Sequence, residues 1–125
     1  MKKLLIVDDE DEITNFLAEF FQNLGYSVQT AGTKEEAFKV LLDYQPMVAL
    51  LDVRMRGSDR AGLEILTWIK EKKLKTKTIM VTAVESKDVI SEAMQIGADD
   101  YITKPLSLEY IETSVAQKIG SMMIE

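Results

Sequence analysis

Five polar side chains stand at the ends of short apolar segments of this sequence: Asp8, Asp9, Asp52, Thr82 and Lys104. The chain contains no cysteine and no histidine. Thiolate nucleophiles, imidazole bases, disulfides and the usual zinc ligand sets are therefore excluded. Any chemistry must come from carboxylates, hydroxyl groups and lysine ammonium groups, and these are the groups that the five side chains supply.

The aspartates favour a site for a hard divalent cation. If adjacent strands deliver carboxylates to one crevice, like charges meet there, which is unfavourable unless protons or a cation intervene. Mg²⁺ prefers oxygen ligands and is commonly held by one or two carboxylates together with phosphoryl oxygens. Lys104 and Thr82 could then bind the other phosphoryl oxygens, and a carboxylate could act as the nucleophile that forms an acyl phosphate.

Five segments predict the strands that position these side chains. The apolar runs at 4–7, 48–51 and 79–81 are typical of strands buried on both faces. The mixed run at 28–31 predicts an edge strand, and 100–103 predicts a short last strand. Because the polar side chains follow these runs, they are expected at strand ends.

Apolar residues at helical spacing predict helices between the strands. The first helix carries an apolar stripe that Gly25 ends. The members of this stripe are Ile13, Phe16, Leu17, Phe20, Phe21 and Leu24. A capping box from Thr33 to Glu36 begins a second helix over 34–43. A polar loop is predicted over 54–62, followed by a third helix with Leu63, Leu66 and Ile69 on its apolar face.

Two further helices are predicted in the last third of the chain. Ser86 is placed to cap the fourth helix and Gly97 to end it. The side chains expected in the core from this helix are Val89, Ile90, Ala93 and Met94. Ser107 is expected to cap the last helix, whose stripe is Leu108, Ile111, Val115 and Ile119. Trp68 and the 7 methionines are interpreted as packing residues.

Five strands that alternate with five helices predict an α/β fold with a parallel sheet covered on both faces. We expect a three-layer α/β/α sandwich of the flavodoxin-like (βα)5 type, with strand order 2-1-3-4-5. In such sheets the functional crevice lies beyond the carboxyl ends of the strands, between strands one and three. The fold therefore predicts that the five polar side chains gather in one crevice.

Composition limits the possible partners. The chain has 125 residues, enough for one domain of ordinary size, and 46% of them are hydrophobic. Its formal net charge of −6 argues against a nucleic acid or an anionic membrane as the main partner. No segment approaches the roughly 20 apolar residues of a membrane span, and the first apolar run is too short for a signal peptide. We therefore expect a cytoplasmic protein.

The residues at the strand ends resemble a known family. Val7-Asp8-Asp9-Glu10, Leu51-Asp52, Thr82-Ala83 and Lys104-Pro105 together resemble the receiver domain of two-component response regulators, over nearly the whole chain. The resemblance implies a receiver domain over 1–120, with 121–125 as a tail or the start of a linker. It implies a phosphorylation-dependent switch rather than a turnover enzyme.

The resemblance also implies a role for each site residue. Asp52 would be the phosphoacceptor, and Mg²⁺ would be held by Asp8, Asp9, Asp52 and the backbone carbonyl of Arg54. Lys104 would pair with the phosphoryl group, and Thr82 and Tyr101 would form the switch pair.

The partners follow from the same resemblance. The phosphoryl donor would be a sensor histidine kinase or a phosphotransfer protein, and the domain would catalyse its own phosphorylation and slow dephosphorylation. The surface of the fourth helix, fifth strand and fifth helix would act on an output domain or protein that the sequence does not identify. A phosphorylation-dependent homodimer is a further implied partner, although the last helix lacks the charged dimer interface of some family members.

One loop departs from the family pattern. Arg56 stands where family members usually carry proline, and the segment 57–62 is about two residues longer than usual. Arg54, Arg56 and Arg60 would bring guanidinium groups near the phosphoryl site. We hypothesise that at least one of them modulates donor docking or the lifetime of the aspartyl phosphate; the alternative is three solvated arginines that balance Asp59 and Glu64.

Other readings of the same residues remain open at this point. Asp8 and Asp9 could merely cap the first helix, and Asp52 could be a solvated turn residue. The domain could be receiver-like without ever being phosphorylated. A haloacid-dehalogenase-type phosphatase needs a second acid two residues after its nucleophile, where this chain has Arg54. An FMN carrier needs a phosphate-binding loop after the first strand, where Asp8 and Asp9 would repel the phosphate.

Overall fold

Five parallel strands form one sheet at the centre of the molecule. The computed structural model describes residues 2–83 and 86–124. The strands are β1 (Lys3–Val7), β2 (Ser27–Ala31), β3 (Val48–Asp52), β4 (Lys77–Ala83) and β5 (Asp100–Lys104). They lie in the order β2-β1-β3-β4-β5, and every neighbouring pair is parallel. The predicted strand order is therefore confirmed.

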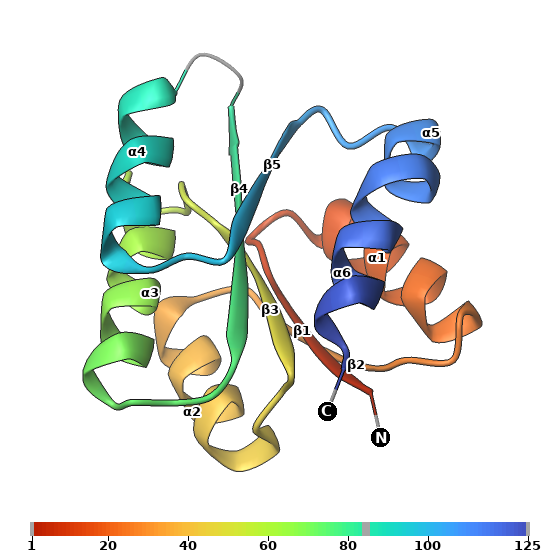
Figure 1. The fold of residues 1–125 in the computed structure, drawn as a ribbon, viewed down its shortest axis with the longest axis horizontal. Helices are drawn as coiled ribbons and strands as arrows, with labels where there is room; N and C mark the ends of the chain where they lie inside the picture. Colours follow the sequence, from red (N-terminus) through yellow and green to blue (C-terminus); the bar gives the residue numbers. More distant parts are fainter. Residues whose placement is uncertain (1, 84–85, 125) are drawn as a thin grey trace.

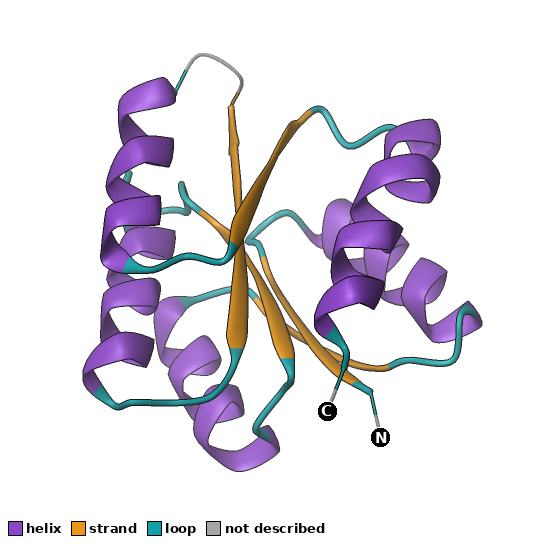
Figure 2. Ribbon diagram, in the orientation of Figure 1, coloured by secondary structure: helices purple, strands orange, loops and turns teal. Residues whose placement is uncertain are grey.

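Helices cover both faces of this sheet. The helical elements are α1 (Asp11–Asn23), α2 (Lys34–Tyr44), α3 (Ala61–Glu71), α4 (Lys87–Ile96), α5 (Leu108–Tyr110), the π-helical turn η1 (Ile111–Val115) and α6 (Ala116–Met122). Figure 1 shows α2, α3 and α4 on one side of the strands and α1, α5 and α6 on the other. The three layers of the predicted sandwich are visible in Figure 2. Within the described ranges, no helix is both long and apolar enough to span a membrane.

The three central strands, β1, β3 and β4, are buried on both faces, as their apolar runs predict, whereas the edge strands β2 and β5 are partly exposed. In β1, Leu5 and Val7 belong to the core under α2 and α3, whereas Leu4 and Ile6 belong to the core under α1 and the C-terminal helix. All four side chains are at most 1% exposed. This alternation fixes the register of the sheet, because a slip of one residue would exchange the two faces.

The helix ends follow local chemistry at most of the expected positions. Thr33 accepts a hydrogen bond from the backbone N–H of Glu36 at 3.1 Å, and the Glu36 carboxylate accepts one from the Gly32 N–H at 3.1 Å. Ser107 accepts from the Tyr110 N–H at 3.1 Å. Ser86 begins α4 without a side-chain capping bond. The N-cap of α1 is Glu10, so the reading of Asp8 and Asp9 as its caps is wrong.

Four side chains predicted on apolar stripes are exposed instead: Phe16, Leu24, Met94 and Leu108, which are 42% to 55% exposed. Each lies at the margin or end of a helix that rests on the sheet, where the contact stripe is narrower than the apolar periodicity. The last helix is also not uniform, because η1 interrupts it. The stripe through Ile111, Val115 and Ile119 is nevertheless fully buried.

The single tryptophan lies between two helices of one face. The ring of Trp68 on α3 lies against Phe38 on α2, with ring centroids 4.6 Å apart. Both side chains are partly buried against the core under α2 and α3. The interpretation of Trp68 as a packing residue is confirmed.

Candidate metal centre

The carboxyl ends of the strands bring the predicted acidic residues together. One carboxylate oxygen from each of Asp8, Asp9 and Asp52 lies within 4.8 Å of the other two. We call these three residues the carboxylate cluster. Asp8 and Asp9 follow β1, and Asp52 ends β3, which is the neighbour of β1 in the sheet. The cluster therefore forms at the point where the strand order reverses, as the doubly wound fold predicts.

Lys104 contacts the buried part of the carboxylate cluster from β5. Its Nζ lies 3.3 Å from Asp8 Oδ2, 3.3 Å from Asp52 Oδ2 and 3.6 Å from Glu10 Oε1. Asp8 and Asp52 are only 4% and 5% exposed, so these contacts are largely shielded from water. One ammonium group thus faces several carboxylates, which leaves the site with an excess of negative charge.

This excess charge and the burial change the proton affinity of two groups. Burial, together with the neighbouring charges of Asp8 and Asp9, raises the pKa of Asp52 to about 7, although Lys104 acts in the opposite direction. Burial by itself would lower the pKa of Lys104, but the charges of Asp52 and Asp8 raise it above its ordinary value. Lys104 is therefore held in its charged form, while Asp52 lacks sufficient compensation for its charge.

Hydrogen bonds orient the other two carboxylates. Asp8 Oδ1 accepts from the Glu10 backbone N–H at 2.9 Å. Asp9 Oδ2 accepts from the Arg56 backbone N–H at 2.8 Å, and the Arg56 guanidinium lies 3.7 Å from the same oxygen. The donor set consists only of oxygens, carries several negative charges and is held in place by backbone groups. These properties fit Mg²⁺, which takes hard oxygen ligands.

A cavity of about 230 Å³ opens beside Asp52. Lys104, Thr82 and Arg54 line it together with Asp52. Thr82 is only 4% exposed, so this part of the cavity lining is shielded from bulk solvent. The space exceeds the roughly 30 Å³ that a water molecule occupies in the liquid several times over, and so accommodates a phosphoryl group with water.

Tyr101 lies outside this cavity. It belongs to β5, two residues before Thr103, which pairs in register with Thr82 of β4. Its side chain is 40% exposed. The structure therefore brings Asp8, Asp9, Asp52, Thr82 and Lys104 together and leaves Tyr101 at the surface.

Gly62 connects α3 closely to the strand that carries Asp52. A Cβ atom at Gly62 would lie 2.5 Å from the backbone oxygen of Asp52 and 2.9 Å from the Cα of Val53. The Gly62 N–H also donates to the Val53 carbonyl at 3.1 Å. Helix α3 begins at Ala61, so the loop predicted over 54–62 is two residues too long at its end.

Comparison with known proteins identifies the family. The family model described as the response regulator receiver domain matches residues 4–116. This chain belongs to that family. Receiver domains of this family are parts of two-component systems, so the resemblance drawn from the strand-end residues is confirmed.

Two curated relatives are similar to this chain over most of the length of the chain. It is 35% identical to the alkaline phosphatase synthesis transcriptional regulatory protein PhoP of Bacillus subtilis over 91% of this chain and 47% of that protein. It is 36% identical to the phosphate regulon transcriptional regulatory protein PhoB of Pseudomonas aeruginosa over 85% of this chain and 46% of that protein. The chain thus spans about half the length of these curated relatives.

A solved structure supports the fold directly. A CheY-like response regulator receiver domain protein from Methanospirillum hungatei superposes with a TM-score of 0.83 at 28% identity. The superposition covers 98% of this chain and 96% of that one. The flavodoxin-like fold is therefore shared from end to end.

The three arginines of the loop after β3 occupy different surroundings in this receiver domain. Only Arg54 lines the cavity beside Asp52. Arg60 instead forms a two-bond pair with Glu92 of α4, one bond of which measures 3.1 Å. The alternative that these arginines balance Asp59 and Glu64 is supported in part. Hydrogen bonds from Ser58 and Lys34 are the main causes that lower the pKa of Glu64, and the charge of Arg60 lowers it as well.

Sequence reasoning missed two polar residues of the site. Glu10 contacts Lys104, and Ser86 lines the cavity beside Asp52. Glu10 stands directly after the two predicted ligands, so its position in the sequence was a usable signal. Ser86 was expected only as a helix cap, and nothing in the sequence indicates that it also lies beside Asp52.

Proposed function

We propose that Asp52 accepts a phosphoryl group from a sensor histidine kinase or a phosphotransfer protein. The observation that carries the proposal is the carboxylate cluster, with its oxygens within 4.8 Å of one another and Lys104 3.3 Å from Asp52. Asp8, Asp9, Asp52 and the backbone carbonyl of Arg54 would hold Mg²⁺. Bound there, Mg²⁺ would neutralise carboxylate and phosphoryl oxygens in a site that is otherwise too negative.

The transfer requires positioning rather than acid–base catalysis. A carboxylate oxygen of Asp52 attacks the phosphorus atom, a new P–O bond forms, and the bond from phosphorus to the donor breaks. Asp52 attacks in its ionised form. With a pKa of about 7, Asp52 is only partly ionised near neutral pH. A bound cation such as Mg²⁺ would favour the ionised form that attacks phosphorus. Lys104 then pairs with the phosphoryl oxygens.

The same event supplies a conformational signal. Phosphorylation replaces the single charge of Asp52 by nearly two charges and adds acceptor oxygens. Thr82 lines the cavity with Asp52, so its hydroxyl is placed to donate to such an oxygen after a small movement. That movement vacates space into which the half-exposed ring of Tyr101 turns. The surface of α4, β5 and the C-terminal helix changes as a result, and a partner can read this change.

The proposed unit has the properties of a switch. It would catalyse its own phosphorylation and slow dephosphorylation, without a diffusible substrate cycle. The family resemblance predicts residues 1–120 as the receiver unit, with 121–125 as a tail or the start of a linker. Because helix α6 continues to Met122 and Met123 is only 4% exposed, we propose that the domain extends to Met123, and a linker would begin after that residue rather than at 121. The output partner, and a homodimer that forms on phosphorylation, belong to the same proposal.

Mass spectrometry after incubation with Mg²⁺ and acetyl phosphate tests the proposal. We expect one added phosphoryl group on the parent protein, none on Asp52→Asn, and none on the parent when a chelator removes the metal. The matched control is Asp59→Asn, because Asp59 is an exposed aspartate of the same loop region and should leave labelling unchanged.

Three outcomes would contradict it. Equal labelling of Asp52→Asn would place the acceptor elsewhere. Absence of labelling in both proteins, with a cognate donor as well as acetyl phosphate, would indicate a receiver-like module that is not phosphorylated. Steady turnover of small phosphoesters would indicate a phosphatase.

A further inference from the structure

A second cavity lies at the end of the sheet opposite the carboxylate cluster. Its volume is about 530 Å³, which is within the usual range for a ligand pocket. We call it the basal pocket. Its lining residues are Leu41, Leu42, Gln45, Pro46, Met47, Lys73, Leu74, Lys75, Thr76, Lys77, Met122 and Ile124. They come from the α2–β3 turn, the α3–β4 turn and the end of α6.

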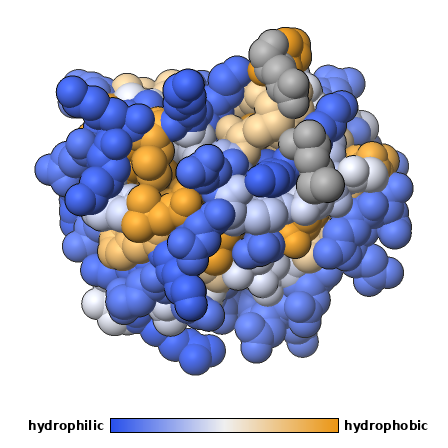
Figure 3. Space-filling view, turned by 90° about the horizontal axis from the view of Figure 1, so that it is seen from below, coloured by the Kyte–Doolittle hydropathy of each residue, from blue (hydrophilic) through white to orange (hydrophobic). Residues whose placement is uncertain are grey.

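The walls of the basal pocket are apolar and partly open to solvent. Leu41 belongs to the buried core, whereas Leu42 and Ile124 are 50% and 72% exposed. Figure 3 views the molecule from this end and shows hydrophobic patches between hydrophilic side chains. An apolar side chain that entered the pocket would therefore contact both the core and these exposed residues.

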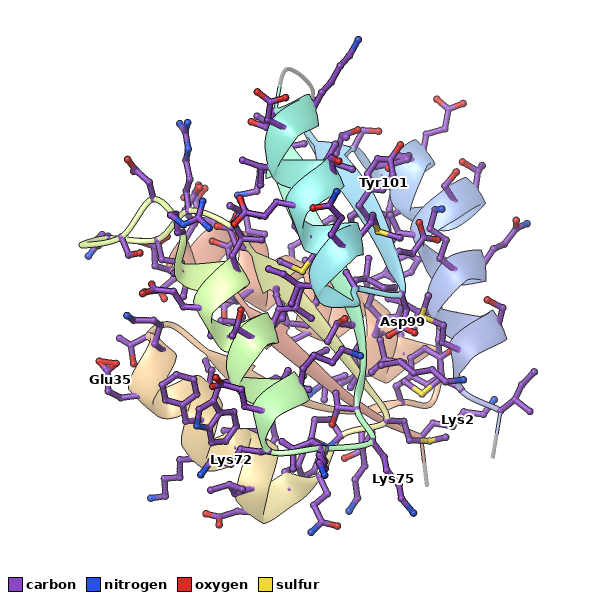
Figure 4. The ribbon with its side chains drawn as sticks, turned by 60° about the vertical axis from the view of Figure 1, so that its left-hand side comes forward. Lys2, Glu35, Lys72, Lys75, Asp99 and Tyr101 are labelled. Atoms are coloured by element: carbon purple, nitrogen blue, oxygen red, sulfur yellow. The ribbon has the colours of Figure 1, made fainter. Side chains whose placement is uncertain are left out.

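The rim of the basal pocket is strongly basic in an acidic protein. Five lysines fall within the eight residues from 70 to 77, although the whole chain carries a net charge of −6. Lys73, Lys75 and Lys77 line the pocket itself. In Figure 4, Lys72, Lys75 and Lys2 lie at this lower end of the molecule. Among the described residues, Lys72, Lys73 and Lys75 form no ion pair within 4.0 Å.

Backbone conformation sets the two turns of the basal pocket apart from other helix ends. Helices α1 and α4 end at Gly25 and Gly97, which have positive φ angles of 94° and 125°. Helices α2 and α3 end instead at Gln45 and Lys73, with φ of 52° and 57°. A side chain in the left-handed region costs conformational energy that glycine avoids. Both residues that carry this cost line the same pocket.

We propose that the basal pocket docks an acidic protein segment that carries large apolar side chains. Carboxylates of the segment would pair with Lys73, Lys75 and Lys77, and an apolar side chain would enter between Leu41 and Leu74. This arrangement uses the basic rim and the apolar interior together. It also gives a role to the side chain of Lys73, at a position where glycine would relieve strain.

The surface fits other macromolecules less well. A membrane favours protruding apolar residues, whereas the basal pocket is concave, and the net charge of −6 opposes an anionic bilayer. Single-stranded nucleic acid requires aromatic rings on which bases stack, and the described lining of the pocket contains none. Docking at this end does not require phosphorylation of Asp52, so the two proposals can be tested separately.

Peptide binding to the unphosphorylated full chain tests the inference. The probe is a fluorescein-labelled synthetic peptide of roughly ten residues in which leucine and phenylalanine alternate with glutamate. We expect saturable binding by anisotropy, with amide NMR shifts concentrated at residues 41–47 and 73–77. The double variant Lys73→Glu, Lys75→Glu should weaken binding about tenfold or more. The control Lys39→Glu, Lys87→Glu changes the net charge equally at exposed positions elsewhere and should bind as the parent does.

Further arms of the experiment distinguish the basis of binding. A peptide with serine in place of leucine and phenylalanine should lose most of its affinity. Equal binding of that peptide, or equal loss in both double variants, would reduce the effect to general charge attraction and overturn the inference. Stronger binding to phosphatidylglycerol vesicles than to the peptide would assign the surface to membranes instead, and no binding by either probe would also overturn it.

Discussion

The two ends of the sheet carry opposite charges in different surroundings. At the carboxyl end, Asp8 and Asp52 are buried and face Lys104 at 3.3 Å. At the amino end, Lys73 and Lys75 are exposed around an apolar cavity. The buried carboxylates lose hydration that the exposed lysines keep, and burial is the largest cause of the raised pKa of Asp52. Burial, more than the number of charges, thus distinguishes the proposed phosphoacceptor site from the proposed docking surface.

The two ends of the sheet also differ in how tightly the backbone is packed. Beside Asp52, α3 approaches so closely that only glycine fits at position 62. Around the basal pocket, the turns keep side chains at Gln45 and Lys73 despite positive φ angles. Close backbone packing therefore fixes the position of Asp52 at the carboxyl end. At the amino end, the turns instead expose the side chains of Gln45 and Lys73 to the basal pocket.

The largest expected effect comes from filling the space at Gly62. Gly62→Ala would place a methyl group 2.5 Å from the backbone oxygen of Asp52, so strand or helix must shift. We expect a loss of about 2–3 kcal/mol in the free energy of unfolding, measured by urea denaturation. We also expect weaker stabilisation by Mg²⁺, because the shift moves Asp52.

Gly120→Ala is the matched control for this change. A Cβ atom at Gly120 in α6 would meet only Tyr26 Oη, at an ordinary 3.6 Å. Alanine there should be neutral or stabilise by about 0.5–1 kcal/mol. Equal changes in the free energy of unfolding for the two substitutions would contradict the conclusion that the backbone is packed more tightly beside Asp52.

A smaller effect is expected from removing the buried charge of Asp52. The folded pKa of about 7 exceeds the ordinary 3.8, so the folded state binds this proton more tightly than the unfolded state. Asp52 therefore lowers stability progressively as pH rises from about 4 to about 7. In a chelator, Asp52→Asn should be more stable than the parent by about 1–2 kcal/mol near pH 8, with little difference near pH 4.

Thermal unfolding at several pH values checks this prediction. Added Mg²⁺ should stabilise the parent near pH 8 and reduce its difference from Asp52→Asn. A difference between the two proteins that did not change with pH would show that burial does not penalise the charge of Asp52, and the contrast between the two ends would lose its physical basis.

The smallest effect is expected at the basal pocket. Lys73→Gly removes a side chain from a position with a positive φ angle, which glycine adopts without strain. We expect the free energy of unfolding, measured by urea denaturation, to increase by about 0.5–1 kcal/mol. Lys72→Gly, at a right-handed position with φ −79°, should not stabilise. Stabilisation by Mg²⁺ should be the same in both variants as in the parent. A destabilised Lys73→Gly would mean that the turn is not strained.

Much of the fold could be predicted because short apolar strands alternate with amphipathic helices along the sequence. Strands such as 48–51 are wholly apolar, and a sheet with helices on both faces is the architecture that buries them. The failures lie where tertiary contacts decide. Phe16 and Met94 follow helical periodicity but lie beyond the stripe that the sheet covers, and the π-helical turn at 111–115 leaves no local signal.

The positions of the main site residues could also be predicted from the sequence. Strand-end positions brought Asp8, Asp52 and Lys104 to one crevice, because the ends of neighbouring parallel strands must coincide. The roles of these residues remain proposals. The partner of Arg60 could not be predicted, since Glu92 is 32 residues away and only the approach of α3 and α4 pairs them.

The contact between Phe38 and Trp68 offers a practical means of observation. Trp68 is the only indole of the chain, and it reports on the junction of α2 and α3 rather than on the cavity beside Asp52. Intrinsic emission will therefore follow melting of that helical layer while remaining nearly silent to events at the aspartates. A substitution that abolishes signalling but preserves the emission spectrum can be assigned to chemistry and not to collapse of the architecture.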